Sequence, residues 1–229
     1  MTFRSVLVAS AADPAALRRA LASAPDILTI ADAEKLGDDA LASLAGAAQR
    51  LWVRLAPLDD PNVEDQLAAV AGLRAEAVVL PAERPQDVEH LGARLAVHEA
   101  DAGLADGFVR IVVTVENAGS LFEIHRLARA SRRVSAIGWN GEALAQDLGA
   151  DDDRELDGRW SDPLQTARAL VLAAAADAGL PAIDSLFTDA DPEALRRETE
   201  RAARDGFAAK FAVTPEQAAI IGSAFGAKG

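Results

Sequence analysis

Residues 110–149 read RIVVTVENAGSLFEIHRLARASRRVSAIGWNGEALAQDLG. Two runs rich in β-branched residues, 111–115 and 134–137, lie on either side of an amphipathic helical pattern. Each run ends abruptly in polar or glycine-containing sequence, at Glu116 after the first and at Asn140 after the second. A buried strand that ends at such a polar residue, followed by a helix and another such strand, is typical of the active face of a parallel α/β barrel.

The alternation of strand and helix continues outward from this stretch in both directions. Helical patterns separate the predicted strands, and a closed parallel barrel fits the repeated units better than the open sheet that counting alone leaves as an alternative. We therefore predict a (β/α)8 TIM barrel, α/β in class, with residues 1–229 as a single domain. The predicted strands are 6–9, 26–30, 51–55, 75–80, 111–115, 134–137, one within 180–187, and 207–213.

Composition excludes several classes of function. The formal net charge of −13 argues against a nucleic-acid or anionic-membrane partner, because both need clustered Lys and Arg. The chain has no cysteine, which excludes disulfides, thiolate catalysis and Cys-ligated zinc. No signal-peptide pattern precedes residues 6–9, and the apolar run 169–178 is far shorter than the ~20 residues of a membrane span. We expect a cytoplasmic protein.

Polar residues at the predicted strand ends are the candidates for chemistry, because the working residues of a barrel lie there. Arg54 stands in an otherwise apolar run and suits a bidentate grip on a carboxylate, although a structural ion pair across the rim is equally compatible. Glu116 is suited to Mg²⁺, which prefers oxygen ligands, or to a helix start, where the dipole favours it. The other candidates are Asp32, Asn117, Asn140, Glu142, Asp184, Asp189 and Thr214.

Seven segments along nearly the whole chain carry a family resemblance: RSVLV (4–8), VRLAPLDDP (53–61), VVLP (78–81), VENAG (115–119), EALAQDLGA (142–150), GLPAIDSLFTD (179–189) and DGFAAKFAVTPEQ (205–217). In order and spacing they resemble the citrate lyase β-subunit (CitE-like) family of the HpcH/HpaI aldolase superfamily. The resemblance implies a TIM barrel that assembles as a homo-oligomer, often a trimer. It also implies a Mg²⁺-dependent carbon–carbon lyase that acts on 2-oxoacid or CoA-thioester substrates.

The resemblance fails where the metal belongs. Family members hold Mg²⁺ with a glutamate after the fifth strand, matched by Glu116, and an aspartate after the sixth, where this chain has Ala143. Glu142, one residue away, is then the remaining candidate for the second metal ligand. Adjacent loop residues point in different directions, so Glu142 can replace the aspartate only if the backbone has shifted.

Other rim positions have changed as well. Of the Asp-Leu-Glu-Asp-Ala pattern that family members carry after the second strand, this chain keeps Asp32, and the resemblance implies catalytic roles for Asp32 and Arg54. Arg54 matches the family arginine that binds the substrate carboxylate. Pro81 and Asn140, at the ends of the fourth and sixth predicted strands, complete the expected substrate-binding set with Arg54.

Two hypotheses follow from this mixture of kept and lost residues. The first is a divergent carbon–carbon lyase of the citrate lyase β-subunit type, in which Glu116 and Glu142 hold Mg²⁺ in a remodelled site. The second is a barrel that has lost catalysis and now binds a carboxylate or serves in an assembly. Under either hypothesis, Arg54 predicts that the ligand carries a carboxylate.

Overall fold

The computed structural model describes residues 3–226, and these residues form a closed barrel of eight parallel strands. Neighbouring strands follow chain order, and the last strand pairs with the first, where Val6 aligns with Phe211. Both edges of the sheet are thus paired, which confirms the predicted TIM barrel and rules out the open sheet. The strands are β1 (Ser5–Ser10), β2 (Ile27–Ala31), β3 (Arg50–Arg54), β4 (Ala77–Leu80), β5 (Arg110–Val115), β6 (Val134–Trp139), β7 (Ala182–Asp184) and β8 (Ala209–Ala212).

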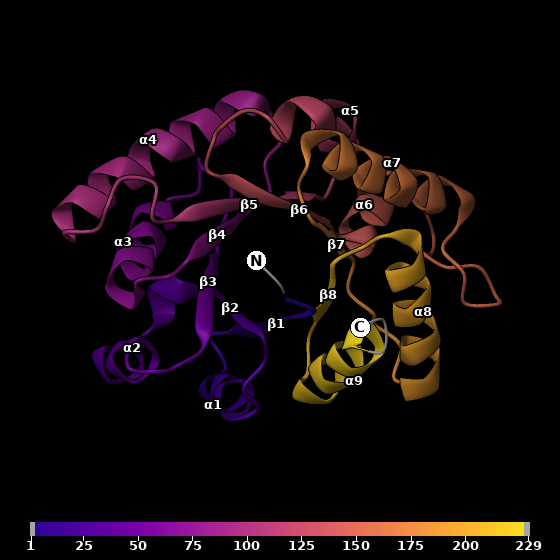
Figure 1. The fold of residues 1–229 in the computed structure, drawn as a ribbon, viewed down its shortest axis with the longest axis horizontal. Helices are drawn as coiled ribbons and strands as arrows, with labels where there is room; N and C mark the ends of the chain where they lie inside the picture. The colour runs from indigo at the N-terminus through magenta and orange to yellow at the C-terminus, as the bar shows by residue number, and fades with distance from the viewer. Residues whose placement is uncertain (1–2, 227–229) are drawn as a thin grey trace.

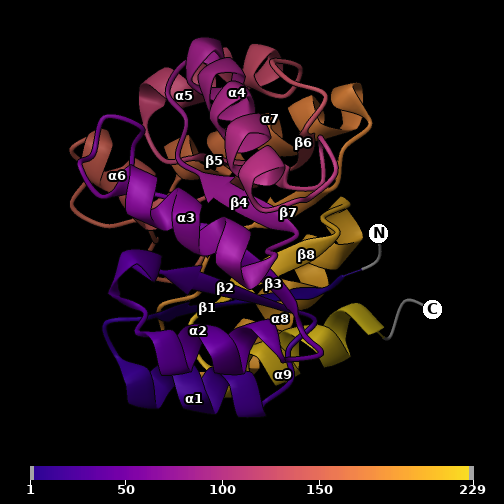
Figure 2. The ribbon, with the colours of Figure 1, turned by 90° about the vertical axis from the view of Figure 1, so that its left-hand side faces the viewer.

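Helices surround the barrel (Figure 1), and Figure 2 shows α1, α2 and α3 one after another along one side. Within residues 3–226, no helix is long and apolar enough to cross a membrane. A short 3-10 helix, η1 (Ala33–Lys35), follows β2. The helices are α1 (Pro14–Ala22), α2 (Asp38–Ala45), α3 (Val63–Leu73), α4 (Pro85–Asp101), α5 (Ala118–Leu127), α6 (Gly141–Asp147), α7 (Asp162–Ala178), α8 (Pro192–Asp205) and α9 (Pro215–Gly226).

Helix starts follow the caps that the sequence indicates, with one correction. Asp13 accepts hydrogen bonds from first-turn N–H groups of α1, and Asp191 accepts one from α8. Each precedes a proline, whose missing N–H would have no partner in the first turn anyway. For α7, the sequence Asp162-Pro163 favours a cap at Asp162, but Ser161 occupies the N-cap position and Asp162 is the first helical residue.

Alternating side chains of the strands build two hydrophobic layers. On β5, Val112 packs in the barrel interior, whereas Ile111 and Val113 pack against the helices. Each such burial stabilises the fold by roughly 1.5–3 kcal/mol relative to an exposed side chain. Phe3 and Trp52 meet edge to face in the interior, with ring centroids 5.3 Å apart. The interior is therefore a packed core, and the space for a ligand lies where the strands end.

Residues 148–161 form an excursion between α6 and α7 that packs over the end of β6. The ring of Trp160 lies 4.8 Å from that of Trp139, and the guanidinium of Arg154 lies 3.3 Å from the centroid of the Trp160 ring. A Cβ on Gly141 would come within 2.5 Å of the Trp160 ring, so glycine is needed at this position for the contact. The excursion thereby fixes the start of α6 next to the barrel mouth.

Candidate active site

An arginine and a glutamate meet at the mouth of the barrel. Arg54 ends β3, and Glu116 directly follows β5. The two form a bidentate pair in which Nη1 donates to Oε1 and Nη2 to Oε2, each at 2.8 Å. The hydroxyl of Thr114 donates a further hydrogen bond to Oε1 of Glu116 at 2.8 Å. The side chains of Arg54 and Glu116 are 32% and 16% exposed, so solvent and small ligands reach them.

This pair forms part of the wall of a cavity of about 120 Å³ at the carboxyl ends of the strands. A concave, largely apolar space with a few converging polar groups is the usual form of a small-molecule site, and this volume suits a small organic acid. The cavity is lined by Val8, Thr29, Arg54, Val79, Thr114, Glu116, Trp139, Asn140, Leu186 and Phe211.

Thr29 gives this cavity a hydroxyl that lacks a partner. Its side chain is 1% exposed, and its Oγ1 has no hydrogen-bond partner within residues 3–226. Leaving a buried polar group unsatisfied costs about 1–3 kcal/mol, which a ligand atom or a water in the cavity would relieve. Thr29 is not among the sequence candidates, although it lies in the predicted strand 26–30. The alternation on β2 carried the signal, because Ile27, two residues earlier, packs in the barrel interior.

Asn140 reaches the same cavity from the end of β6. Its backbone N–H donates to the carbonyl of Val115 at 2.9 Å, and its Oδ1 accepts from the N–H of Ala143 at 3.3 Å, which caps α6. The side-chain amide nitrogen has no hydrogen-bond partner among the described residues, so it offers N–H donors beside Arg54. The structure thus brings three of the sequence candidates, Arg54, Glu116 and Asn140, to one cavity.

Asp32 and Pro81 do not line this cavity. Asp32 follows β2 in the left-handed region, with φ of 54°, and its carboxylate accepts from the Ser10 hydroxyl and pairs with Lys35 at 3.4 Å. The hydrogen bond from Ser10 and the charge of Lys35 hold the pKa of Asp32 below its ordinary value. Pro81 follows β4 and is half-buried. Both residues lie at the rim, where they were predicted, but neither lies beside Arg54.

The carboxylates at the mouth do not fit a two-carboxylate Mg²⁺ site. Both oxygens of Glu116 are engaged by Arg54, and Ala143 offers no oxygen from its side chain. Glu142 is exposed in the first turn of α6, where its charge acts on Asp153, whose pKa is raised by burial first and then by neighbouring carboxylates. Among the described residues, no group of three or more His, Cys, Asp or Glu could hold a metal ion.

Asp184, another of the acids among the sequence candidates, faces away from the mouth. It lies on the outer side of β7, is fully buried, and takes hydrogen bonds from Trp139 and Arg168. Lys210 of β8 is also fully buried, 3.7 Å from Asp184 and 2.8 Å from Glu198 of α8. Burial alone would raise the pKa of Asp184, but the charges of Lys210 and Arg168 hold it below its ordinary value.

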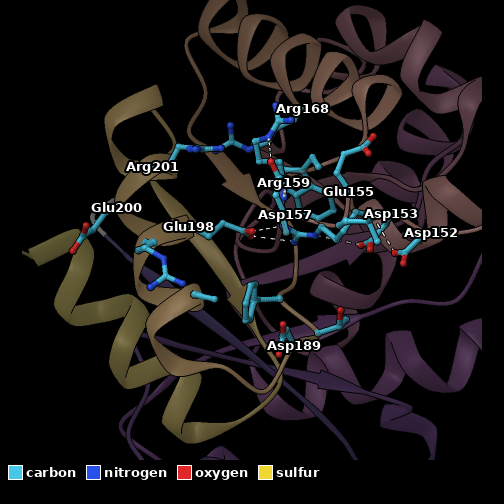
Figure 3. Close-up of a pocket in the computed structure, with 18 of the residues that line it drawn as sticks. Asp152, Asp153, Glu155, Asp157, Arg159, Arg168, Asp189, Glu198, Glu200 and Arg201 are labelled. Carbon is cyan, nitrogen blue, oxygen red and sulfur yellow. Dashed lines mark hydrogen bonds and ion pairs between the residues drawn. The ribbon is translucent and has the colours of Figure 1, made fainter.

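A larger cavity of about 700 Å³ lies outside the barrel, between the 148–161 excursion and α8 (Figure 3). Both walls carry acids and arginines, such as Asp157 and Arg159 on the excursion and Glu200 and Arg201 on α8. Arg154 joins the two walls through an ion pair with Glu198. This larger cavity lies away from the carboxyl ends of the strands, where the working residues of a barrel lie. The smaller cavity at the mouth is therefore the candidate active site.

Comparison with known proteins identifies relatives of this chain. The model of the HpcH/HpaI aldolase/citrate lyase family matches residues 4–215. The chain is 26% identical to the L-malyl-CoA/β-methylmalyl-CoA lyase of Cereibacter sphaeroides (strain ATCC 17025), over 93% of this chain and 75% of that protein. It is also 26% identical to the citrate lyase β subunit of Leuconostoc mesenteroides, over 82% of this chain and 61% of that subunit.

The fold has solved relatives as well. The chain is similar to the CitE protein of Mycobacterium tuberculosis in complex with magnesium and acetoacetate, with a TM-score of 0.80 and 25% identity. That match covers 98% of this chain and 90% of the other. Magnesium and a small carboxylate therefore occur together in a relative that shares this barrel.

Proposed function

Because the chain belongs to the HpcH/HpaI aldolase/citrate lyase family, we propose that it is a divergent carbon–carbon lyase that cleaves a 2-oxoacid or CoA-thioester substrate of the malyl type. The observation that carries the proposal is the Arg54–Glu116 pair in the wall of the mouth cavity. A guanidinium at this place recognises a carboxylate through two parallel hydrogen bonds, and Glu116 occupies it in that way when no ligand is bound.

Binding then exchanges one carboxylate for another. A substrate carboxylate takes the two donors of Arg54, and Glu116 is released into the cavity, where Thr114 and Asn140 are its neighbours. The pair is partly exposed, so its net stabilisation is small, about 1 kcal/mol or less, and a ligand can replace it. The amide N–H groups of Asn140 and the hydroxyl of Thr29 have no partner within the described part of the chain and can donate to substrate oxygens.

The released carboxylate suits a general base. Cleavage of a malyl-type thioester removes the proton of the carbinol hydroxyl and breaks the adjacent carbon–carbon bond. The electron pair moves into the thioester enolate, which then takes up a proton to give the acyl thioester, while the carbinol carbon becomes the carbonyl of a 2-oxoacid. In this proposal Glu116 accepts the hydroxyl proton, and Arg54 holds the carboxylate that stays on the oxoacid.

The test is release of the oxoacid from L-malyl-CoA by the purified protein, followed as its hydrazone, with Glu116→Gln and Arg54→Ala beside it. We expect cleavage that both substitutions remove. Absence of cleavage in the parent protein, with and without added Mg²⁺, would contradict the lyase.

A second candidate function is a catalytically inactive barrel that binds a carboxylate. Ala143 favours it, because the side chain that completes the metal site in the family is missing and no other described acid joins Glu116. Oxoacid binding that needs Arg54, without cleavage of any thioester, is the result that this reading predicts.

A further inference from the structure

Two adjacent residues at the end of β7 hold the two residues that flank Asn140. Oδ1 of Asp184 accepts a hydrogen bond from the indole N–H of Trp139 at 2.8 Å. Oγ of Ser185 accepts from the backbone N–H of Gly141, also at 2.8 Å. Asn140, which lines the mouth cavity, is thus clamped from both sides by a neighbouring strand.

Ser185 is itself held in place by the buried lysine. It is 1% exposed, and its carbonyl accepts from Nζ of Lys210 at 2.6 Å. Lys210 is fully buried and has Glu198 and Asp184 as its acidic neighbours, at 2.8 and 3.7 Å. The ammonium therefore connects the outer charge cluster to the backbone of the residue that holds Gly141.

Side-chain packing also restricts movement at the start of α6. Trp160 lies against both Trp139 and Gly141, and Arg154 lies over Trp160 while it pairs with Glu198. Glu198 thus connects the two sets of contacts, because it pairs with Arg154 of the excursion and also with Lys210, which holds Ser185. Movement of the β6–α6 loop would break contacts on both sides at once.

Stability alone gives little reason for such a cluster. Removing charges from water costs several kcal/mol for each ion, and well-packed apolar residues of similar volume are often as stable as a buried ion pair. What the cluster provides is orientation. The hydrogen bond from the backbone N–H of Gly141 restrains the backbone after Asn140, and the bond from the indole of Trp139 holds the side chain before it, in directions that apolar contacts would not specify.

We propose that Ser185, supported by Lys210, is a positioning residue that keeps the side-chain amide of Asn140 aimed into the cavity beside Arg54. The inference rests on the proposed function in one respect, namely that Asn140 contacts the substrate. It goes beyond that function by assigning a role to residues on the outside of the barrel, none of which lines the mouth cavity.

The variant that tests the proposal is Ser185→Ala, with Thr199→Val as a matched control. Thr199 is fully buried on α8, and its hydroxyl donates to the carbonyl of Leu195 at 2.8 Å, so the control also removes one buried hydroxyl but leaves the mouth untouched. Ser185→Thr restores the hydroxyl. Each protein is titrated with pyruvate by calorimetry, and amide hydrogen exchange is followed for residues 139–144.

We expect Ser185→Ala to lower the affinity for pyruvate about fivefold, the same loss that we expect for Asn140→Ala, and to speed exchange in residues 139–144. Ser185→Thr should recover the affinity. Thr199→Val should lower the melting temperature by a similar amount, with affinity and local exchange unchanged. A purely structural role of Ser185 would lower the melting temperature in both variants and leave the affinity of both at the parent value.

Wild-type affinity and exchange in Ser185→Ala would overturn the proposal, as would an equal loss of affinity in Thr199→Val. If the parent protein shows no binding of pyruvate that depends on Arg54, the proposed function fails instead. Hydrogen exchange then decides the positioning role by itself. Faster exchange confined to residues 139–144 in Ser185→Ala supports the positioning role of Ser185, and unchanged exchange contradicts it.

Discussion

The barrel mouth and the outer face of β7 and β8 both carry paired charges, but in opposite surroundings. At the mouth, Arg54 and Glu116 are partly exposed and open to a cavity. On the outer face, Asp184 and Lys210 are fully buried, and Arg168 adds a second cation. Arg54 and Glu116 each have the other as their main partner, whereas each charged residue of the outer group has several partners.

This difference separates a pair that a ligand can replace from a group that must stay together. Breaking the mouth pair exposes two charges to water and to the ligand, so little free energy is lost. Breaking the outer group leaves an ion in a dry interior, which costs far more. Binding is therefore expected at the mouth, and the outer group is expected to hold the frame on which the mouth is built.

Lys210→Met should give the largest effect on stability. It leaves Asp184 and Glu198 buried without their shared cation, and we expect a loss of about 3–5 kcal/mol in the free energy of unfolding. Arg54→Met, at the mouth, should cost about 1 kcal/mol or less. Urea unfolding of both variants measures the contrast, and equal losses would show that the two regions do not differ as described.

Removing Arg54 should give the largest effect on binding. We expect Arg54→Ala to weaken pyruvate binding at least tenfold, because a charge-assisted bidentate pair is worth about 1.5–3 kcal/mol. The melting temperature should change little. Calorimetry measures the affinity, and a variant that binds like the parent protein would take Arg54 out of the site.

Acid should weaken the outer group as its buried carboxylates take up protons. The folded pKa of Asp184 lies below its ordinary value of 3.8, so the stability that it contributes is complete above that value and is lost as the pH falls towards the folded pKa. Glu198 acts in the same direction. In Asp184→Asn, the free energy of unfolding should fall less steeply with decreasing pH below 3.8. An unchanged slope would show that protonation of Asp184 is not the cause of the fall.

Asp32→Asn should give the smallest effect. Asp32 lies outside the mouth cavity and is engaged by Ser10 and Lys35, so we expect oxoacid affinity and turnover within about twofold of the parent protein. The sequence-based expectation of a catalytic Asp32 predicts a large loss of turnover instead. The malyl-CoA assay decides between the two.

Much of the fold could be predicted from the sequence, because periodicity is local. The β-branched runs at 111–115 and 134–137 fall within β5 and β6, and the proline-marked helix starts at Asp13 and Asp191 are present. The seventh strand was harder to bound. Its three residues, Ala182–Asp184, lie within a longer, mostly apolar stretch, and no hydrophobic periodicity marks where the strand begins or ends.

Less of the site could be predicted, because its partners come from distant parts of the chain. The sequence marked Arg54 and Glu116 separately, but nothing in it states that the two form one pair across 62 residues. It also treated Asp184 as a strand-end acid. The alternation of inward and outward side chains on β7 turns Asp184 to the outside, since Ile183 occupies the interior.

Glu116 is expected to hold Arg54 until a ligand carboxylate replaces it, and calorimetric titration of Glu116→Gln with pyruvate, with and without Mg²⁺, measures this exchange. We expect binding about fivefold tighter than in the parent protein and independent of Mg²⁺, because the competing carboxylate is gone and its pair was worth roughly 1 kcal/mol. Loss of pyruvate binding in Glu116→Gln, together with loss of Mg²⁺ binding, would contradict the exchange and would return Glu116 to the role of a metal ligand.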